Sequence, residues 1–240
     1  MASTTAHSLR EQVAWACRIL ASEGYVDLTL GHLSARAPGE TTVYIKRKGI
    51  GLDEVYPEDV VELDLTEERP LARGMHLEAV LHSEVYKLRD DVGAVVHGHP
   101  PYATAFSATD ATLALLTHDS VLFADGVVVH GETPELITEP EQARAVAEAL
   151  GGCRALVLRN HGVLVVGKDV PWAVLAAVTL ERAIRLQAIA GALGPLRPIP
   201  QAFAERMLDE KYRDGFVEEY WDAWIRRLRR SGADVGMPAA

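Results

Sequence analysis

The chain has 240 residues and carries 24 lysines and arginines against 34 aspartates and glutamates, a formal charge of −10 that leaves no basic face for nucleic acid. Apolar residues make up 48% and charged residues 24%, which argues against disorder, and the longest apolar run, residues 170–180, is too short to span a membrane. Polar residues at the N-terminus argue against a secretory signal, and two isolated cysteines are too few for a disulfide scaffold. We therefore expect one cytoplasmic domain over 1–240, with 201–240 as a helical tail.

The N-terminal third of the chain predicts a helix followed by short strands. A capping box from Ser8 to Glu11 opens the helix, and apolar residues recur at helical spacing until Gly24 ends it. Alternating apolar and polar residues then predict three strands and a second helix, in chain order 32–36, 43–46, 61–65 and 77–89.

The rest of the chain predicts buried strands among longer helices. An apolar strand covers 93–99, and two β-branched runs, 155–159 and 163–166, flank residues 160–162, which we interpret as a hairpin turn. Helices are predicted at 141–150, from a cap at Asp169 to about 190, and at 201–229. Strands grouped between helices predict an α/β fold with a mixed or antiparallel sheet. A dinucleotide-binding fold is disfavoured, because the sequence has no βαβ series with a glycine-rich first turn.

Three of the nine histidines form the most informative pattern. His97 and His99 close an apolar strand, and side chains two apart on a strand point to the same face, about 6.6 Å apart. They can converge on one cation, with His161 at the hairpin tip as the best third ligand. Three imidazoles leave an open coordination position, as in catalytic zinc sites. Alternatively, each histidine is an ordinary residue with a hydrogen-bond partner.

Glu78 and His82 lie four residues apart on the predicted helix before this strand, so they share one helical face. If that face covers the end of the strand, the carboxylate lies beside the metal and binds it or acts as a general base. The alternative is an exposed pair on a solvated face.

Two further polar segments could bind an anion. His32, Ser34 and Arg36 share one face of a short strand, which is either an oxyanion-binding edge or the wet side of an edge strand. A basic run before a turn could clamp a carboxylate or phosphate, or could be a solvated loop. Its residues are Lys46, Arg47, Lys48 and Gly49.

Together these segments resemble the class II aldolase/adducin family. The matching pieces are GHLSAR (31–36), PEDVV (57–61), Glu78-x3-His82-x3-Tyr86, AVVHGH (94–99) and NHG (160–162). The resemblance implies α-β-α layers with a central mixed, mostly antiparallel sheet, and a homotetramer with active sites between subunits. It also implies one divalent cation (Zn, Mn, Co or Fe) per subunit, held by His97, His99 and His161, and a glutamate, Glu78, that acts as acid/base and sometimes touches the metal.

The resemblance fails at the phosphate site. Phosphosugar aldolases of the family show a Ser-Ser pair before the glutamate, whereas this chain has His76 and Leu77. Residues 97–107 and 116–123 look more like the branch that decarboxylates hydroxylated aromatic or heteroaromatic carboxylates.

The resemblance therefore implies a metal-dependent carbon–carbon lyase that works through a metal-stabilised enolate on a small anionic substrate, with decarboxylation favoured. Glu78 or His118 would move the proton, and Tyr220 of a neighbouring subunit would reach the site. Residues of the two anion-binding segments would orient the substrate. The alternatives are a retro-aldolase on a sugar phosphate or hydroxyketone, an adducin-like interaction module without metal, and an Fe(II) oxidase. A zinc hydrolase is disfavoured because the chain has no H-E-x-x-H helix.

Overall fold

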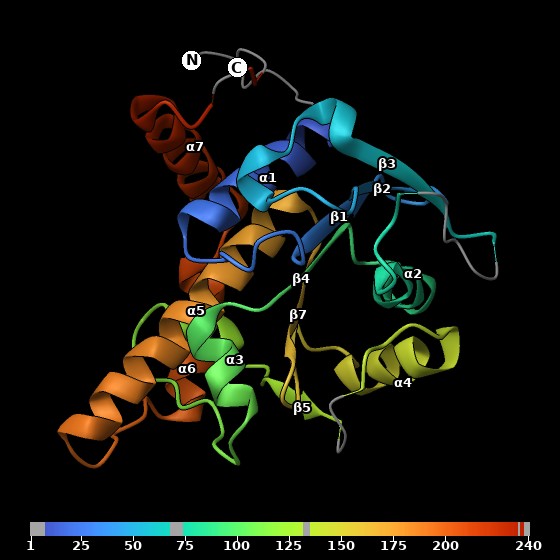
Figure 1. Cartoon of the computed structure of the whole chain (residues 1–240). Helices are drawn as coiled ribbons and strands as arrows, with labels where there is room; N and C mark the ends of the chain where they lie inside the picture. The colour runs from blue at the N-terminus through green and yellow to red at the C-terminus, as the bar shows by residue number, and fades with distance from the viewer. Residues whose placement is uncertain (1–7, 68–73, 132–134, 235, 238–240) are drawn as a thin grey trace.

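The computed structural model describes residues 8–67, 74–131, 135–234 and 236–237, so residues 1–7, part of the segment that argues against a secretory signal, lie outside it. Within these ranges seven strands form one sheet in the order β3-β2-β1-β4-β7-β6-β5 (Figure 1). The strands are β1 His32–Arg36, β2 Thr42–Lys46, β3 Val60–Asp64, β4 Ala94–Gly98, β5 Val128–His130, β6 Ala155–Leu158 and β7 Gly162–Gly167. The described ladders are antiparallel except for β5 with β6, which confirms the mixed, mostly antiparallel sheet.

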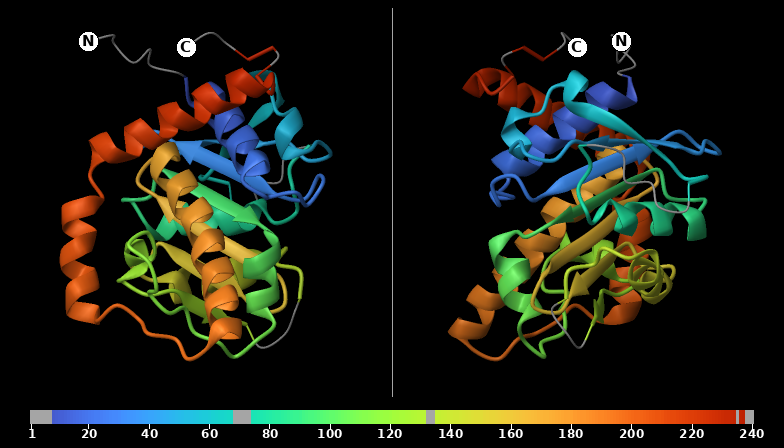
Figure 2. Two further views of the ribbon diagram at one scale, coloured as in Figure 1. Left: turned by 90° about the vertical axis from the view of Figure 1, so that its left-hand side faces the viewer. Right: turned by 45° about the vertical axis from the view of Figure 1, so that its right-hand side comes forward.

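Helices cover both faces of the sheet, as expected for α-β-α layers (Figure 1). Their bounds are α1 Leu9–Ser22, α2 Ala79–Leu88, α3 Pro101–Ser107, α4 Pro140–Leu150, α5 Val170–Leu193, α6 Gln201–Lys211 and α7 Asp214–Ser231. Short 3-10 turns lie at η1 Leu52–Glu54, η2 Pro57–Asp59 and η3 Ser120–Phe123. Helices α1 and α5 cover one face and α2 and α4 the other, and α7 packs on α1 and α5 (Figure 2).

The period of two along the strands divides the core between these faces. Ala94 and Val96 of β4 join the apolar cluster under α1 and α5, whereas Val95 joins the cluster under α2 and α4. His97 therefore continues the side of Val95 and faces α2. The same alternation in β1 puts Leu33 and Ala35 on the α1 side.

The structure tests the predicted helix boundaries at both ends of the chain. Ser8 Oγ accepts a hydrogen bond from the Glu11 amide and the Glu11 carboxylate accepts one from the Ser8 amide, which confirms the capping box at α1. The single helix predicted over 201–229 is wrong, because the helix breaks at Tyr212 and restarts at Asp214. Tyr212 is buried and donates its hydroxyl to the Asp119 carbonyl, which ties the break to the start of η3.

Among the residues that the structure describes, no helix has both the length and the hydropathy to cross a membrane.

Candidate metal centre

His97 and His99 come from the end of β4 in the middle of the sheet. His97 is almost fully buried, and its Nδ1 donates to the Val163 carbonyl at 3.1 Å, so its Nε2 carries the free lone pair. His99 follows one residue after β4 ends, with its ring centroid 4.9 Å from that of His97. The expected convergence of the two rings is present.

The hairpin between β6 and β7 brings His161 to the same point. Asn160 adopts a left-handed φ of 56°, which asparagine tolerates, and Leu158 pairs with Gly162. A Cβ on Gly162 would lie 2.5 Å from the Gly98 carbonyl oxygen, so only glycine lets the hairpin approach β4 this closely. The His161 ring consequently lies 5.1 Å from both His97 and His99.

Glu78 completes the group from the other side. It is the N-cap residue of α2, and its carboxylate oxygens lie 3.5 Å from Nε2 of His97 and 3.5 Å from Nε2 of His161. Burial opposes ionisation of Glu78, but the influence of the neighbouring His161 and His97 rings outweighs it and holds the pKa of this carboxyl well below its usual range. Glu78 is therefore ionised at neutral pH.

These four side chains fit a divalent cation. Glu78, His97, His99 and His161 each offer one ligand atom, and all four atoms lie within 4.8 Å of one another. Within the described ranges, Nε2 of His97 is buried and has no hydrogen-bond partner. Burial lowers the pKa of His97, which keeps this nitrogen neutral and able to bind metal. Three imidazoles and a carboxylate suit Zn, Mn, Co or Fe.

A cavity of about 670 Å³ opens beside this group. Three exposed leucines, Leu30, Leu77 and Leu136, lie on its wall, with exposed fractions of 60%, 55% and 53%. Its polar lining outside the metal group is short: Thr29, Lys48, His76 and Asn160. The site therefore joins a charged centre to a largely apolar wall.

The basic run predicted as an anion clamp is divided by the structure. Lys48 and Gly49 line the cavity, whereas Arg47 turns away and pairs with Asp59 at 2.7 Å. Lys46 points inward, fully buried, and its Nζ donates to the Thr29 carbonyl and lies 3.3 Å from Nε2 of His76. An exposed clamp of three adjacent cations is not formed.

The two edge-strand interpretations of residues 32–36 are wrong. Strand β1 lies between β2 and β4, and all five of its residues are buried. Ser34 Oγ bonds His82 and Tyr86, and Arg36 donates to the carbonyls of Val92 and Arg89. Neither side chain lines the cavity, because alternation places this polar face against α2 rather than against solvent.

His32 and His82 extend the same buried row. Nδ1 of His32 lies 2.7 Å from Nε2 of His82, and the His32 ring centroid is 5.0 Å from that of His97. Glu78 lies beside His97 and His161, as expected if this end of the helix covers the strand, although it is the N-cap of α2 rather than part of the helix. The alternative of an exposed pair is wrong, because Glu78 and His82 are both buried. His82 faces β1 instead.

His118 and Tyr220 lie outside the cavity lining within one chain. His118 is exposed before η3, where its carbonyl accepts from Lys211. Tyr220 lies on α7 with its ring 4.4 Å from that of Phe216. The proton transfer predicted for His118 and the contact predicted for Tyr220 of a neighbouring subunit stay predictions.

Asp27 and His76 have no functional role predicted from the sequence, yet both adjoin the centre. Asp27 accepts from Nδ1 of His99 at 2.6 Å, and His76 lines the cavity with its ring 4.4 Å from that of His32. The sequence could have indicated a place for His76 near the site, because it lies two residues before Glu78. No sequence pattern could have indicated Asp27, because 72 residues separate it from His99.

A family model described as the class II aldolase and adducin N-terminal domain matches residues 11–188 of the chain. The chain belongs to the class II aldolase and adducin family. This membership confirms the resemblance seen in the sequence motifs.

Relatives within the class II aldolase family include both decarboxylases and aldolases. The chain is 31% identical to a 3,4-dihydroxyphthalate decarboxylase of Arthrobacter keyseri, over 80% of this chain and 83% of that protein. It is 30% identical to an L-fuculose phosphate aldolase of Methanococcus maripaludis, over 72% of this chain and 92% of that protein. A crystal structure of an aldolase II superfamily protein from Pseudomonas syringae superposes with a TM-score of 0.81 at 29% identity, covering 94% of each chain.

The histidine–glutamate group is consistent with the divalent-metal site typical of class II aldolases. Family membership and this group together indicate a metal-dependent carbon–carbon lyase of the class II aldolase superfamily.

Proposed function

We propose that the chain decarboxylates a hydroxylated aromatic or heteroaromatic carboxylate. The observation that carries this proposal is the cavity beside the metal group, in which Leu30, Leu77 and Leu136 form an apolar wall and Lys48 supplies a cation. A planar ring fits an apolar wall better than a hydroxyl-rich sugar does, because burying unpaired hydroxyls is unfavourable. Leu77 also offers no hydroxyl to a phosphate.

Glu78, His97, His99 and His161 would hold the cation, which when bound acts as a Lewis acid for adjacent substrate oxygens. Glu78 is ionised, so it can take the proton of the ring hydroxyl and return it to the carbon that bears the carboxylate. The C–C electron pair goes to the ring as CO2 leaves, and the product hydroxyl regains a proton from water. Lys48 orients a second anionic group, and the leucines pack against the ring.

The test is an assay of Zn²⁺- or Mn²⁺-loaded protein against two substrate panels, hydroxybenzene or hydroxypyridine carboxylates and phosphorylated ketoses. We expect CO2 release from the first panel and no aldehyde from the second. Metal-free protein is the control for both. Aldehyde release from a ketose phosphate without decarboxylation would overturn the proposal.

A double substitution tests the metal site itself. Replacing His97 and His99 together by alanine should abolish stoichiometric metal binding and turnover, because two of three imidazoles are lost. Unchanged metal content in the double variant would refute the site.

Retro-aldol cleavage is the second candidate function. It is favoured by the 30% identity to an L-fuculose phosphate aldolase, and Lys48 and Gly49 in the cavity could bind a phosphate. The ketose panel above tests it directly. An adducin-like module without metal would show neither bound metal nor turnover in either panel.

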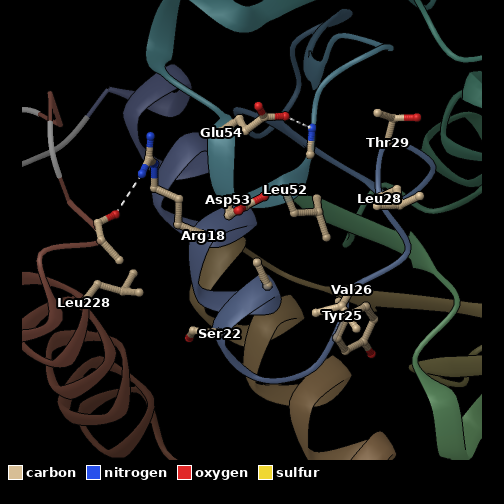
Figure 3. Close-up of a pocket in the computed structure, with 13 residues that line it drawn as sticks. Arg18, Ser22, Tyr25, Val26, Leu28, Thr29, Leu52, Asp53, Glu54 and Leu228 are labelled. Carbon is tan, nitrogen blue, oxygen red and sulfur yellow. Dashed lines mark hydrogen bonds between the residues drawn. The ribbon is translucent and has the colours of Figure 1, made fainter.

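We propose further that the active form is a homo-oligomer, a tetramer by family likeness, with sites between subunits. The segment before β1 exposes Val26 and Leu28, at 67% and 84%, beside a second cavity of about 670 Å³ (Figure 3). Leu28 also has a φ of 55°, a conformation that leucine rarely adopts in exposed loops. A second copy on this surface would bury these apolar side chains.

A further inference from the structure

One carboxylate outside the proposed ligand set is committed to a ligand histidine. Asp27 Oδ2 accepts from Nδ1 of His99 at 2.6 Å and from the His99 amide at 3.1 Å. The Asp27 side chain is only 9% exposed, and within the described residues its other oxygen, Oδ1, is buried without a hydrogen-bond partner. Burying a carboxylate with one unpaired oxygen costs solvation free energy, which indicates a role beyond capping a loop.

We propose that Asp27 is a positioning residue that fixes His99 in the Nδ1–H tautomer and directs its Nε2 at the cation site. A histidine whose Nδ1 donates to a carboxylate keeps its lone pair on Nε2, and such partners orient the ring and raise its basicity as a ligand. The inference rests on the metal site of the proposed function and not on the reaction assigned to it.

The need for Asp27 follows from where β4 ends. His97 lies inside β4 and obtains the same orientation from a neighbouring strand, because its Nδ1 donates to the Val163 carbonyl. His99 lies beyond the last residue of β4, where the ladder offers its ring no such carbonyl. Asp27 therefore supplies from a loop what the sheet supplies to His97.

The surrounding residues hold Asp27 in place. Tyr25 donates its hydroxyl to the Ala177 carbonyl of α5 and so anchors the segment to the core. A Cβ on Gly98 would lie 2.9 Å from Cδ1 of Tyr25, and a Cβ on Gly31 would lie 2.9 Å from Oδ1 of Asp27. The glycine of the His-Gly-His motif thus leaves room for the segment that delivers Asp27.

The Thr29 backbone is a second anchor on the far side of Asp27. Its carbonyl accepts from the buried Nζ of Lys46, and Thr29 lines both the metal-site cavity and the neighbouring cavity drawn in Figure 3. The segment is therefore tied to the core on both sides of Asp27, which keeps the carboxylate preorganised.

The experiment compares Zn²⁺ affinity, measured by chelator competition on metal-free protein, for three variants. We expect Asp27→Ala to weaken Zn²⁺ binding by about 10- to 100-fold, the usual effect of removing such a partner. Asp27→Asn should weaken it less, because the amide oxygen still accepts from Nδ1 of His99. Asp53→Asn is the matched control, since Asp53 is exposed on η1 and lines the neighbouring cavity (Figure 3), whose lining includes no ligand histidine, and we expect native affinity.

A second readout separates positioning from a general structural role. Nitrogen NMR of the His99 ring in metal-free protein at pH 8 should show the Nδ1–H tautomer in the native chain and in Asp27→Asn, and a mixture in Asp27→Ala. The tautomer in the native chain and the Asp27→Asn affinity decide the matter even if Asp27→Ala does not fold.

Equal Zn²⁺ affinity in Asp27→Ala and the native chain, or an Nε2–H tautomer of native His99, would overturn the role of Asp27 alone. A native chain that binds no Zn²⁺ would instead overturn the metal site, and with it both proposals.

Discussion

Glu78 presents one carboxylate oxygen to His97 and the other to His161, so its chemistry can be tested by changing a single atom. Glu78→Gln keeps the shape and an amide oxygen but removes the base. We expect nearly native metal content, because three imidazoles remain, and a turnover loss of about 10²-fold or more, as removal of a general acid/base gives. Metal analysis and steady-state kinetics measure both.

Glu40→Gln is the matched control, since Glu40 is exposed in the turn between β1 and β2. Full activity of Glu78→Gln would remove Glu78 from proton transfer.

At this scale the sequence predicted which residues share a face but not what covers that face. The period of two along a strand was enough to bring His97 and His99 together, and the hairpin signal brought His161 to them. The same period grouped Ser34 with Arg36, yet only the packing of α2 on β1 shows that these side chains serve internal hydrogen bonds. Contacts between distant segments leave no local pattern.

Four histidines, from β1, β4, α2 and the segment before α2, are buried side by side: His32, His76, His82 and His97. Burial is the largest cause that lowers their pKa values, to about 4 for His76, where the Lys46 charge acts in the same direction. Glu78 opposes the shift at His76, His82 and His97 without reversing it.

This row of histidines should make the metal-free protein sensitive to acid. Unfolded histidines titrate near 6.5, so between about pH 4 and 6.5 the unfolded chain binds more protons than the folded one. The free energy of unfolding therefore falls as pH drops through this window, by up to about 1.4 kcal/mol per pH unit for each histidine. Urea denaturation between pH 5 and 8 measures the slope.

His82→Gln should reduce that slope, whereas His118→Gln, at an exposed position, should leave it unchanged. A native slope of zero across the window would contradict the prediction.

At the scale of elements, the approach of the β6–β7 hairpin to β4 depends on Gly162. Gly162→Ala would place a methyl group 2.6 Å from Cδ2 of His99 as well as against the Gly98 carbonyl. We expect a loss of about 1–3 kcal/mol in unfolding free energy and weaker metal binding, because the hairpin must move away. Thermal unfolding and metal titration measure the two effects.

The control is Gly152→Ala, since a Cβ on Gly152 meets nothing within 4 Å. If Gly162→Ala binds metal like the native chain, then the hairpin approach does not set the position of His161.

Element boundaries were predictable where local chemistry defines them and not elsewhere. The cap at Asp169 and the capping box at Ser8 gave the starts of α5 and α1 from side-chain hydrogen bonds alone. The break at Tyr212 depends on a bond to Asp119, 93 residues away, so helical periodicity continued through it. Helix α3 and the three-residue strand β5 were not predicted, because short elements are set by the surfaces they pack on.

At the scale of the molecule, the proposed assembly can be tested at Leu28. Leu28→Asp introduces a charge into the proposed interface, and aspartate tolerates the left-handed φ of 55° better than leucine does, so the subunit fold should persist. We expect light scattering to show a multiple of 26.1 kDa for the native chain and a smaller species for the variant.

Leu193→Asp is the matched control, because Leu193 is equally exposed at the far end of α5. A native chain that remains monomeric at micromolar concentration would contradict the proposed assembly.

The layered architecture was the most predictable property of the whole chain. Strands with alternating or β-branched patterns in the middle and helices around them leave few arrangements, and the family motifs select one of them. The strand order in the sheet depends on long-range pairing such as β1 with β4, which no local signal encodes.

Leu30 and Leu136 of the cavity wall lie on loops, whereas Leu77 directly precedes Glu78 in the turn that leads into α2. Two of the three wall residues, Leu30 and Leu136, are therefore separate in sequence from the residues of the reactive centre. A library randomised at positions 30 and 136 would sample new substrates while the residues of the reactive centre stay unchanged, which makes this chain a convenient starting point for directed evolution.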